Sequence, residues 1–496
     1  MARKIQSRLH ITGTLVAQSP IHVGGIGGNS QVDLALAVNG QGQYYIPGTS
    51  LAGALRGWME MSINYSTLAT LWGFQEENGR VGHASFVLVE DAAIEGAVSE
   101  IREGVGINRI WGTAEDKFKY NRAILPKGTK IPLNITLDIS PKSDNEKALL
   151  AQLLKALENG EIRLGAAKTR GLGRVKLENL SIREHNLGNR NGILKMLQGN
   201  SDRLNLNDLF NSDGQFPQAS QITIEIHWQP QTSVMVKAEG DGIVVDILPL
   251  VSEFDNHLSF VLPGSSIKGA LRTQAERIVR TVCHWPTQQY FQEQIELSLV
   301  EDLFGVRAKA NNQNNKGIGS LFIDDCYANM RINHHTWADI QSSKSNSDLR
   351  QNLNRVNLQT TQQAFHVAID RWTGGAADSF LYSNIELIGV NWQPIRLQLN
   401  LKRIQENQLP GIALILLVLR DLAEGRIALG YGTNRGMGSI EVVKIIIQGR
   451  NLADSLKELE SKELPNGNIN EFSPSVLNYL SQAWQDWIHQ NIKESK

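Results

Sequence analysis

The chain has 496 residues, of which 41% are hydrophobic and 20% are charged, with 44 Gly and 14 Pro. This composition is typical of a folded protein of about three domains, and it excludes a disordered or collagen-like chain. Lys and Arg number 49 against 50 Asp and Glu, a formal net charge of −1. That balance excludes a polycationic protein that binds nucleic acid through its overall field, but it allows a local basic groove.

The N-terminus alternates polar and apolar residues, as a strand does, and lacks the apolar segment of a signal peptide. The longest unbroken apolar run, residues 412–419, is too short for the roughly 20 residues that span a bilayer. We therefore expect a cytoplasmic protein. Cys283 and Cys326 cannot form a disulfide framework or a zinc site by themselves, so we expect buried free thiols.

An aspartate, Asp33, follows a glycine-rich turn at residues 24–28 and lies among apolar neighbours. Asp246 lies in a similar apolar setting in the second half of the chain. A carboxylate in such a place could bind a divalent ion or orient a ribose hydroxyl. Taken alone, each is more often a solvent-facing acid on a strand. The scattered histidines show no metal-binding spacing and are expected to be structural.

Residues 47–56 and 263–272 share seven of ten positions, beginning with Pro-Gly-[Thr/Ser]-Ser in each half. The pattern predicts a helix that starts after a prolyl turn, where a hydroxyl can cap the first amides. Free amides at a helix start, with a cation one or two turns on, favour a phosphate. A capped helix that only packs on a sheet is the alternative, and the recurrence in both halves weakens it. The candidate phosphate ligands are Ser50 and Arg56, then Ser265, Ser266, Lys268 and Arg272.

Glycine-rich segments follow at residues 164–175 and 429–440. They place Lys168, Arg170 and Gly171, and then Arg435 and Gly436, in loops where glycine lets the backbone approach a ligand closely. A guanidinium presented from such a loop suits a phosphate, because its fork matches the oxygens. Neither segment has the Gly-Lys-[Ser/Thr] ending of a nucleotide-binding P-loop, so an NTPase is disfavoured.

A third pair of similar segments, residues 107–114 and 369–376, lies between these landmarks, and the order is the same in both halves. The chain therefore contains one unit twice. We predict a first unit at 1–184, a polar linker at 185–218 and a second unit at 219–450, which includes an exposed insertion at about 331–362. Residues 451–496 are predicted to form amphipathic helices that pack on the second unit.

Together, these segments resemble two fused units of the RAMP superfamily (repeat-associated mysterious proteins), in particular the Cas-seven backbone subunits of type III CRISPR effector complexes. The resemblance rests on residues 47–56 and 263–272, on the loops around Arg170 and Arg435, and on residues 369–371. It implies an α+β fold: two tandem ferredoxin-like, RNA-recognition-motif-like units, each with a β-hairpin thumb, polymerised along a guide RNA with other effector subunits.

The resemblance also implies roles for single residues. The guide CRISPR RNA would run over the glycine-rich loops and the helix starts, and the thumbs, which carry Arg109 and Arg371, would splay a nucleotide of the complementary target RNA. Asp33 matches the aspartate that supports metal-dependent cleavage, with Mg²⁺ or Mn²⁺, and Asp246 matches it most plausibly in the second unit. Other acids near Asp246 leave that second assignment open; they are Asp241, Glu253 and Asp255.

Two departures from the pattern stand out. The lysine of the second helix, Lys268, is replaced by Ala52 in the first, and the thumb has Asn108 where the second unit has Asp370. The leading hypothesis is an RNA-guided endoribonuclease subunit in antiviral defence. The alternatives are a non-catalytic guide-binding subunit and a metal-independent, guide-processing endonuclease.

Overall fold

The computed structural model describes residues 4–25, 32–61, 63, 65–76, 81–140, 145–210, 219–238, 242–306, 317–356, 358 and 361–492. The chain divides into two compact units. Unit 1 consists of Met1–Arg102, Asn121–Lys168 and Leu172–Ala219, and unit 2 of Glu103–Tyr120, Thr169–Gly171 and Ser220–Lys496. None of the helices within the described ranges is long and apolar enough to cross a membrane.

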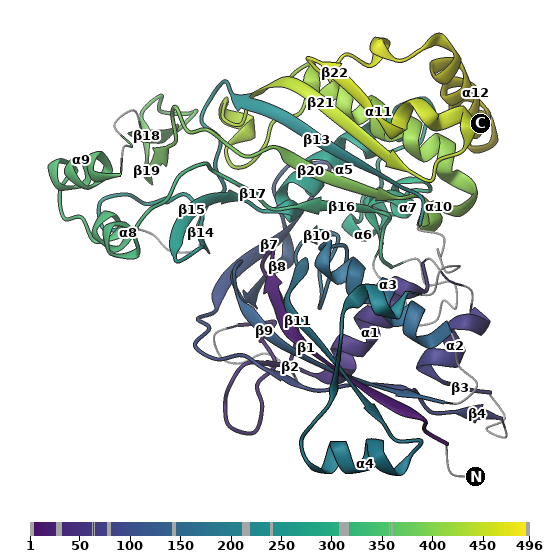
Figure 1. The fold of residues 1–496 in the computed structure, drawn as a ribbon. Helices are drawn as coiled ribbons and strands as arrows, with labels where there is room; N and C mark the ends of the chain where they lie inside the picture. The colour runs from purple at the N-terminus through teal and green to yellow at the C-terminus, as the bar shows by residue number, and fades with distance from the viewer. Residues whose placement is uncertain are drawn as a thin grey trace. The chain divides into compact units, whose positions relative to one another are not determined.

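Unit 1 is built on an antiparallel sheet with the strand order β12-β11-β1-β9-β5 (Figure 1). A helix connects β1 to β5 and another connects β9 to β11, which is the β-α-β-β-α-β order of a ferredoxin-like fold. These elements are β1 (Ser7–Ala17), α1 (Gly48–Met59), β5 (Val87–Val89), β9 (Lys130–Ile139), α3 (Asn145–Glu158), β11 (Val175–Asn186) and β12 (Asp202–Leu204).

Shorter elements complete the first half of the chain. They are β2 (Tyr45–Ile46), α2 (Tyr65–Trp72), β3 (Phe74–Gln75), β4 (Gly82–His83), β6 (Ala92–Ala93), α4 (Arg190–Leu197) and η1 (Leu206–Leu209). A long hairpin of β7 (Glu100–Ile107) and β8 (Ala114–Ile124) projects from this half, and its outer part, residues 103–120, belongs to unit 2.

The core of unit 1 follows from two sequence periods. Strand β1 alternates, so that Leu9, Ile11 and Leu15 are fully buried on one face. Helix α1 buries Leu51 and Leu55 at helical spacing in the same hydrophobic cluster. These two sets of apolar side chains pack α1 on the sheet and determine where along the sheet the helix begins.

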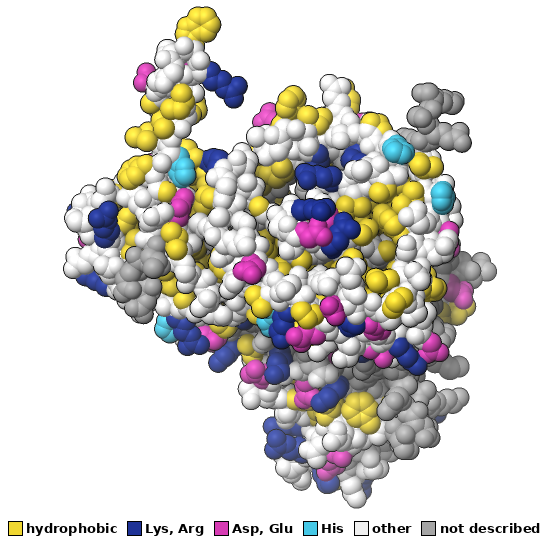
Figure 2. Space-filling view, turned by 90° about the horizontal axis from the view of Figure 1, so that it is seen from above, with side chains coloured by type: hydrophobic (Ala, Val, Ile, Leu, Met, Phe, Trp, Pro, Cys, Tyr) yellow, Lys and Arg dark blue, Asp and Glu magenta, His cyan; other side chains and the backbone are white. Residues whose placement is uncertain are grey.

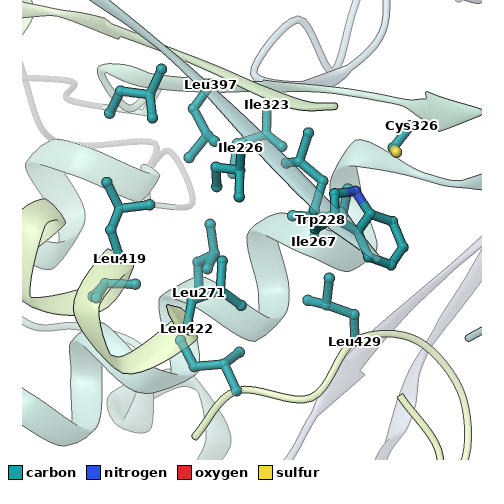
Figure 3. Close-up of a cluster of buried hydrophobic side chains, with 14 of the residues drawn as sticks. Ile226, Trp228, Ile267, Leu271, Ile323, Cys326, Leu397, Leu419, Leu422 and Leu429 are labelled. Carbon is teal, nitrogen blue, oxygen red and sulfur yellow. The ribbon is translucent and has the colours of Figure 1, made fainter. Parts of the chain in front are cut away.

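Unit 2 repeats this arrangement with the strand order β10-β16-β20-β13-β21-β22. The equivalent elements are β13 (Gln221–Pro230), α5 (Gly264–Val282), β16 (Leu321–Asp324), β20 (Ile395–Asn400), α11 (Gln408–Ala423), β21 (Ile440–Arg450) and β22 (Lys462–Pro465). Figure 3 shows its core, where Ile226 of β13 lies with Leu271 of α5 and Leu419 of α11. The structure therefore confirms the predicted α+β fold of tandem ferredoxin-like units with hairpins.

The remaining elements of the second half surround this core. They are β14 (Val251–Phe254), β15 (His257–Leu262), α6 (Phe291–Gln294), α7 (Val300–Phe304), β17 (Cys326–Tyr327), α8 (His334–Gln341), α9 (Asn346–Arg355), β18 (Gln362–Ile369), β19 (Ala376–Glu386), α10 (Leu401–Ile404), η2 (Gln405–Asn407), η3 (Thr433–Arg435), η4 (Asp454–Glu460), η5 (Ile469–Glu471) and α12 (Pro474–Asn491). Strands β18 and β19 form a second hairpin. Strand β10 (Arg170–Gly171) comes from the first half of the chain and pairs in parallel with β16.

Two segments differ from their predicted character. Residues 185–210 of the expected linker end β11 and form α4, β12 and η1, with Leu209 buried in the unit 1 core; residues 211–218 lie outside the described part. The tail contains the strand β22 between η4 and α12, and this strand extends the sheet of unit 2. The polar composition of the first segment and the apolar stripes of the second do not show which sheet edge is open to a further strand.

Candidate nucleic-acid interface

The two candidate aspartates occupy matching positions. In unit 1 the Asp33 backbone N–H donates to Asn121 Oδ1 at 2.7 Å, and the Asn121 N–H donates to Asp33 Oδ2 at 2.8 Å. In unit 2 the Asp246 N–H donates to Ser383 Oγ at 3.3 Å, and the Ser383 N–H donates to Asp246 Oδ2 at 2.7 Å. Each aspartate is thus fixed to the second strand of a hairpin, β8 or β19, through the same exchange of hydrogen bonds.

The residues that follow each aspartate extend the match. Leu34 forms a parallel bridge to Arg122, and Ile247 forms one to Asn384. Both aspartates are exposed, and Oδ1 of each has no hydrogen-bond partner among the described residues. One carboxylate oxygen therefore fixes the side chain while the other faces solvent.

Arg435 lies over two aromatic rings in unit 2. Its guanidinium carbon is 4.8 Å from the ring centroid of Tyr431 and 5.5 Å from that of Tyr382. Tyr382 directly precedes Ser383, the partner of Asp246, and it stacks on His366 at 5.2 Å between centroids. Burial raises the pKa of Tyr431, so its ring stays neutral beneath the cation. The exposed guanidinium is thus held by cation–π contacts, one of them with the tyrosine that directly precedes the hydrogen-bond partner of Asp246.

Arg170 has a related contact through the matching tyrosine. Its Nη1 donates to the Tyr120 hydroxyl at 3.1 Å, and the arginine is exposed. Tyr120 and Tyr382 both stand eleven residues after the thumb arginines, Arg109 and Arg371, so aligning the hairpins by their tips would have found this pair from sequence. Lys168 is half-buried in the same loop.

The glycine-rich loops share an unusual backbone. Gly165 has φ +74° and Gly430 has φ +88°, and a Cβ there would lie 2.1 Å from the His22 carbonyl oxygen and 2.2 Å from that of Met235, respectively. Only glycine combines this dihedral angle with so close an approach. The requirement is internal to each unit, so these two glycines shape the loops and do not themselves identify a ligand.

At the starts of α1 and α5, where the sequence predicts a phosphate site, the first backbone amide bonds to a carboxylate. Pro47 and Pro263 are the N-cap residues, and neither supplies a side-chain cap. Carboxylates take that place: Gly48 N–H donates to Asp91 Oδ1 at 2.7 Å, and Gly264 N–H donates to Asp325 Oδ1 at 2.8 Å. A carboxylate at a helix start satisfies an amide and repels a second anion, so the first amide of each helix is not free for a phosphate.

The serines of these helices remain near the surface. Ser50 and Ser266 are half-buried, with backbone N–H groups that donate to the carbonyl oxygens of Pro47 and Pro263, and Ser265 is exposed. Arg56 is partly exposed and pairs with Glu60 at 3.3 Å, one turn further along α1.

Two predicted RNA ligands in α5 lie inside unit 2. Lys268 is 5% exposed and its Nζ donates to the Leu321 carbonyl oxygen at 2.7 Å. Arg272 donates from Nε to Glu276, from Nη1 to the Gly305 carbonyl and from Nη2 to the Ile295 carbonyl. Their cationic groups bond to the protein itself. The helix face that carries them packs on β16 and α7, so both cations are engaged within unit 2.

The two thumb arginines differ in their exposure to solvent. The side chain of Arg109 is 14% exposed and pairs with Glu276 at 2.5 Å, whereas Arg371 is exposed at the tip of the β18–β19 hairpin. The exchange of Asn108 for Asp370 leaves the turn unchanged, since each side chain accepts hydrogen bonds from two backbone amides that follow it. Those bonds hold the pKa of Asp370 below its ordinary value.

His22 and the two cysteines are buried. His22 is 3% exposed with Nδ1 at 2.7 Å from the Ala123 carbonyl oxygen, and burial lowers its pKa. Cys283 and Cys326 are buried free thiols, as predicted, and burial raises the pKa of each. Among the described residues, no group of three or more His, Cys, Asp or Glu side chains is placed to hold a metal.

The fold and the repeated loops define a tandem ferredoxin-like protein with two long hairpins. The family model of the RAMP superfamily matches residues 14–176 and again residues 251–441, so the chain belongs to the RAMP superfamily. RAMP proteins bind CRISPR RNA and other effector subunits, and this chain is a CRISPR-associated, RNA-binding member of that class. None of the curated proteins compared with the chain matches it.

Proposed function

We propose that this chain is a double backbone subunit of a type III CRISPR effector that binds guide and target RNA and cleaves the target once in each repeat. The observation that carries the proposal is the repeated acid: Asp33 and Asp246 are held by the same pair of hydrogen bonds and turn one carboxylate oxygen to solvent. In each repeat, one oxygen fixes the carboxylate and the other is left for a ligand.

The reaction would be transfer of the target RNA's own phosphate. The carboxylate accepts the proton of a ribose 2′-hydroxyl, the O2′–P bond forms, and the P–O5′ bond breaks. The products are a 2′,3′-cyclic phosphate and a 5′-hydroxyl that takes up a proton from solvent. The guanidinium of Arg435, and that of Arg170 in the first loop, would bind the phosphates on either side.

The donor set suits a divalent ion bound partly by substrate. A single exposed carboxylate fits Mg²⁺ or Mn²⁺, which are commonly held by one or two carboxylates together with phosphate oxygens and water. Asp33 and Asp246 would hold it, and when bound it neutralises charge on the phosphate.

The test uses the assembled complex with its guide and an end-labelled complementary RNA. We expect two cuts per copy of the chain. Asp33→Ala should remove one cut and Asp246→Ala the other, each by about 100-fold or more. Asp454→Asn is the matched control, because Asp454 is an exposed acid of η4 and is not a candidate for the site, and it should keep both cuts.

Each other outcome has a defined meaning. A double variant of Asp33 and Asp246 that keeps both cuts would overturn the assignment. Full cleavage in the presence of a chelator would favour the metal-independent, guide-processing alternative. A complex that binds target tightly without cutting it would favour the non-catalytic subunit.

A further inference from the structure

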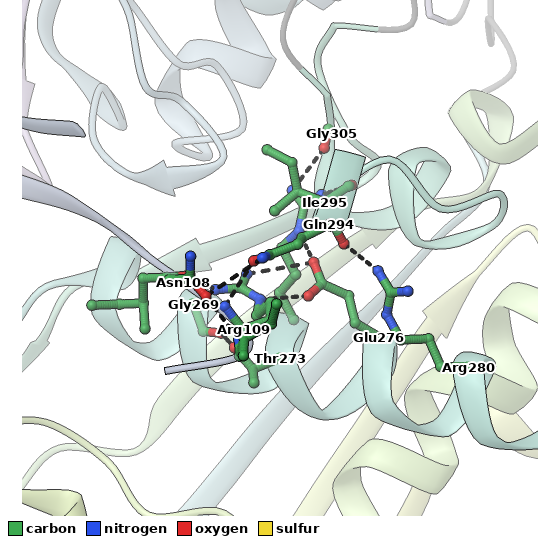
Figure 4. Close-up of polar contacts among 12 residues, drawn as sticks. Asn108, Arg109, Gly269, Thr273, Glu276, Arg280, Gln294, Ile295 and Gly305 are labelled. Carbon is green, nitrogen blue, oxygen red and sulfur yellow. Dashed lines mark hydrogen bonds and ion pairs between the residues drawn. The ribbon is translucent and has the colours of Figure 1, made fainter. Parts of the chain in front are cut away.

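The two hairpins are held at different places. The first is held at its tip, where Arg109 pairs with Glu276 and its backbone N–H donates to Gln294 Oε1 at 2.8 Å (Figure 4). The tip of the second is exposed, and Figure 2 shows this hairpin as a narrow arm. The contacts described for the second hairpin lie at its base, where Ser383 holds Asp246.

The segment at residues 242–246, which ends at the second candidate aspartate, is bound by two further neighbours. The Ile243 backbone N–H donates to the carbonyl oxygen of Gln341 at 3.1 Å. The carbonyl oxygen of Val244 accepts a hydrogen bond from Gln363 Nε2 at 3.0 Å. All of these residues belong to unit 2. The backbone is thus fixed from two sides within three residues of the aspartate.

Gln341 is the last residue of α8, in the insertion, and packing fixes the position of that helix. Trp337 of α8 is 5% exposed, and its ring lies against Phe260 of β15 with centroids 5.8 Å apart. Ile332, which precedes α8, exchanges backbone hydrogen bonds with Leu258 of the same strand at 2.8 and 2.7 Å. Strand β15 leads directly into α5. The carbonyl end of α8, where oxygens lack partners within the helix, is therefore a fixed acceptor for the segment.

The first repeat lacks the residues for either support. Its chain passes from β6 to β7 through residues 94–99, whereas the second repeat passes from β17 to β18 through residues 328–361, which form α8 and α9. Counted back from the tip arginines, the residue equivalent to Gln363 is Ile101, whose side chain has no hydrogen-bonding group. Both supports are therefore particular to the second repeat.

A fixed segment matters because a carboxylate acts on a substrate only when it is in place. The Asp246 side chain is held through one oxygen, and the position of its backbone depends on the residues before it. Ordering a loop costs conformational entropy, and that cost is absent from the binding step when the loop is already ordered. Small displacements of a reacting group lower the rate strongly, so support from neighbouring residues affects catalysis.

We propose that Gln363 and the insertion at residues 331–362 position Asp246 for cleavage by fixing residues 242–246 before the target RNA binds. Gln363 is a positioning residue, because it acts through the Val244 carbonyl and not on the RNA. The proposal rests on the proposed function for the role of Asp246, whereas the fixed backbone can be measured without any cleavage.

Hydrogen exchange of the effector complex, purified without target RNA, tests the contribution of Gln363. The amides of residues 242–250 are followed in the parent protein and in Gln363→Met, which keeps the length of the side chain but removes the donor. We expect exchange to become about fivefold faster. Gln362→Met is the matched control, because the neighbouring Gln362 faces the other side of the strand and donates to Glu386. It should leave the exchange at 242–250 unchanged.

Two measurements test the contribution of the insertion. In the parent complex, the Ile243 amide should exchange at least about tenfold more slowly than an unprotected amide, because it bonds to α8. Exchange at the unprotected rate would exclude support by the insertion. Trp337→Leu, which loosens α8 from Phe260, should speed exchange at 334–341 and 242–250 together and leave β21 unchanged. Faster exchange in α8 alone would contradict the proposal.

Single-turnover cleavage measures the consequence for Asp246. In the assembled complex with its guide and an end-labelled target, Gln363→Met should slow the cut that depends on Asp246 by about fivefold. The other cut should keep its rate, and the target concentration that gives half the maximal rate should stay the same. A residue that contacts RNA would raise that concentration, and a general loss of structure would slow both cuts, so either result would overturn the positioning role.

The two kinds of measurement separate this proposal from the proposed function. A parent complex that makes no cut would refute the role given to Asp246. Unchanged exchange at residues 242–250 in Gln363→Met would refute the support itself, whatever the complex cuts.

Discussion

At the scale of the residue, burial distinguishes side chains that have similar sequence surroundings. Lys268 and Arg435 are both cations close to glycines in matching landmarks, yet one is buried against Leu321 and the other lies exposed over two tyrosines. Sequence pattern places a residue on an element, but the face of the helix and its neighbours decide whether the charge meets solvent.

Replacing Lys268 should therefore affect stability and not RNA binding. Lys268→Met keeps the apolar stem but removes the donor to the Leu321 carbonyl, which should cost about 1–3 kcal/mol. Urea unfolding measures the loss, and fluorescence anisotropy with a labelled RNA measures affinity. If the Lys268→Met variant unfolds at the same urea concentration as the parent protein but binds RNA more weakly, then Lys268 contacts RNA.

The pKa of His22 gives a pH-dependent contribution to stability. Because burial lowers the pKa of this histidine below 6.5 in the folded protein, the unfolded chain takes up a proton that the folded chain does not. Stability should then fall as the pH drops below about 6.5. His22→Gln keeps a donor for the Ala123 carbonyl and should flatten the dependence of Tm on pH between 7 and 5.

A matched substitution tests this assignment. His334→Gln, at an exposed histidine of α8, should leave the pH dependence as it is in the parent protein. An unchanged profile in the His22 variant would mean that other groups cause the acid sensitivity.

At the scale of the element, the repeat predicts which elements exist but not what each one contacts. The ten-residue segments at 47–56 and 263–272 correctly indicate two helices that start after a proline. Their caps come from Asp91 and Asp325, more than forty residues further along the chain. No local sequence pattern predicts these caps. The order of the landmarks likewise predicts the hairpins, while the contacts of the first hairpin involve Gln294 of α6, for which the described residues of the first repeat show no equivalent helix.

The Glu276 carboxylate of α5 holds the tip of the β7–β8 hairpin through its ion pair with Arg109. Its side chain is 2% exposed and it pairs with both Arg109 and Arg272. Removing one member of a buried ion-pair group leaves uncompensated charge, so Glu276→Gln should cost about 3–5 kcal/mol. The chain itself supplies the control: Glu60, the equivalent residue directly after α1, is 51% exposed, and Glu60→Gln should cost about 0–1 kcal/mol.

Calorimetry of the two full-length variants measures this difference. The transition that contains unit 2 should move for Glu276→Gln, and the other transition should stay in place for both variants. Equal shifts for the two substitutions would contradict the view that the hairpin is held through Glu276.

At the scale of the whole molecule, a net charge of −1 has to be reconciled with an RNA-binding protein. Several arginines that look available in the sequence bond to the protein itself, as Arg109 and Arg272 do. We therefore expect the exposed cations in the glycine-rich loops, Arg170 and Arg435, to carry more of the RNA contact than their number suggests. Binding should rest on a few local contacts and not on a general positive field.

This distribution predicts a shallow dependence of RNA binding on salt that changes with single residues. For a single strand, each phosphate contact adds about 0.7 to the slope of log affinity against log salt concentration. Arg170→Ala and Arg435→Ala should each reduce the slope by about that amount. Arg350→Ala is the control and should leave the slope unchanged, because Arg350 lies on α9 and not in either loop. Arg435→Lys keeps the charge and should restore the slope while lowering affinity, since an ammonium loses the fork geometry and the flat contact with Tyr431 and Tyr382. Anisotropy titrations of the full chain with one labelled RNA at several salt concentrations give all four slopes, and a steep slope that no single substitution alters would place the RNA on a different surface.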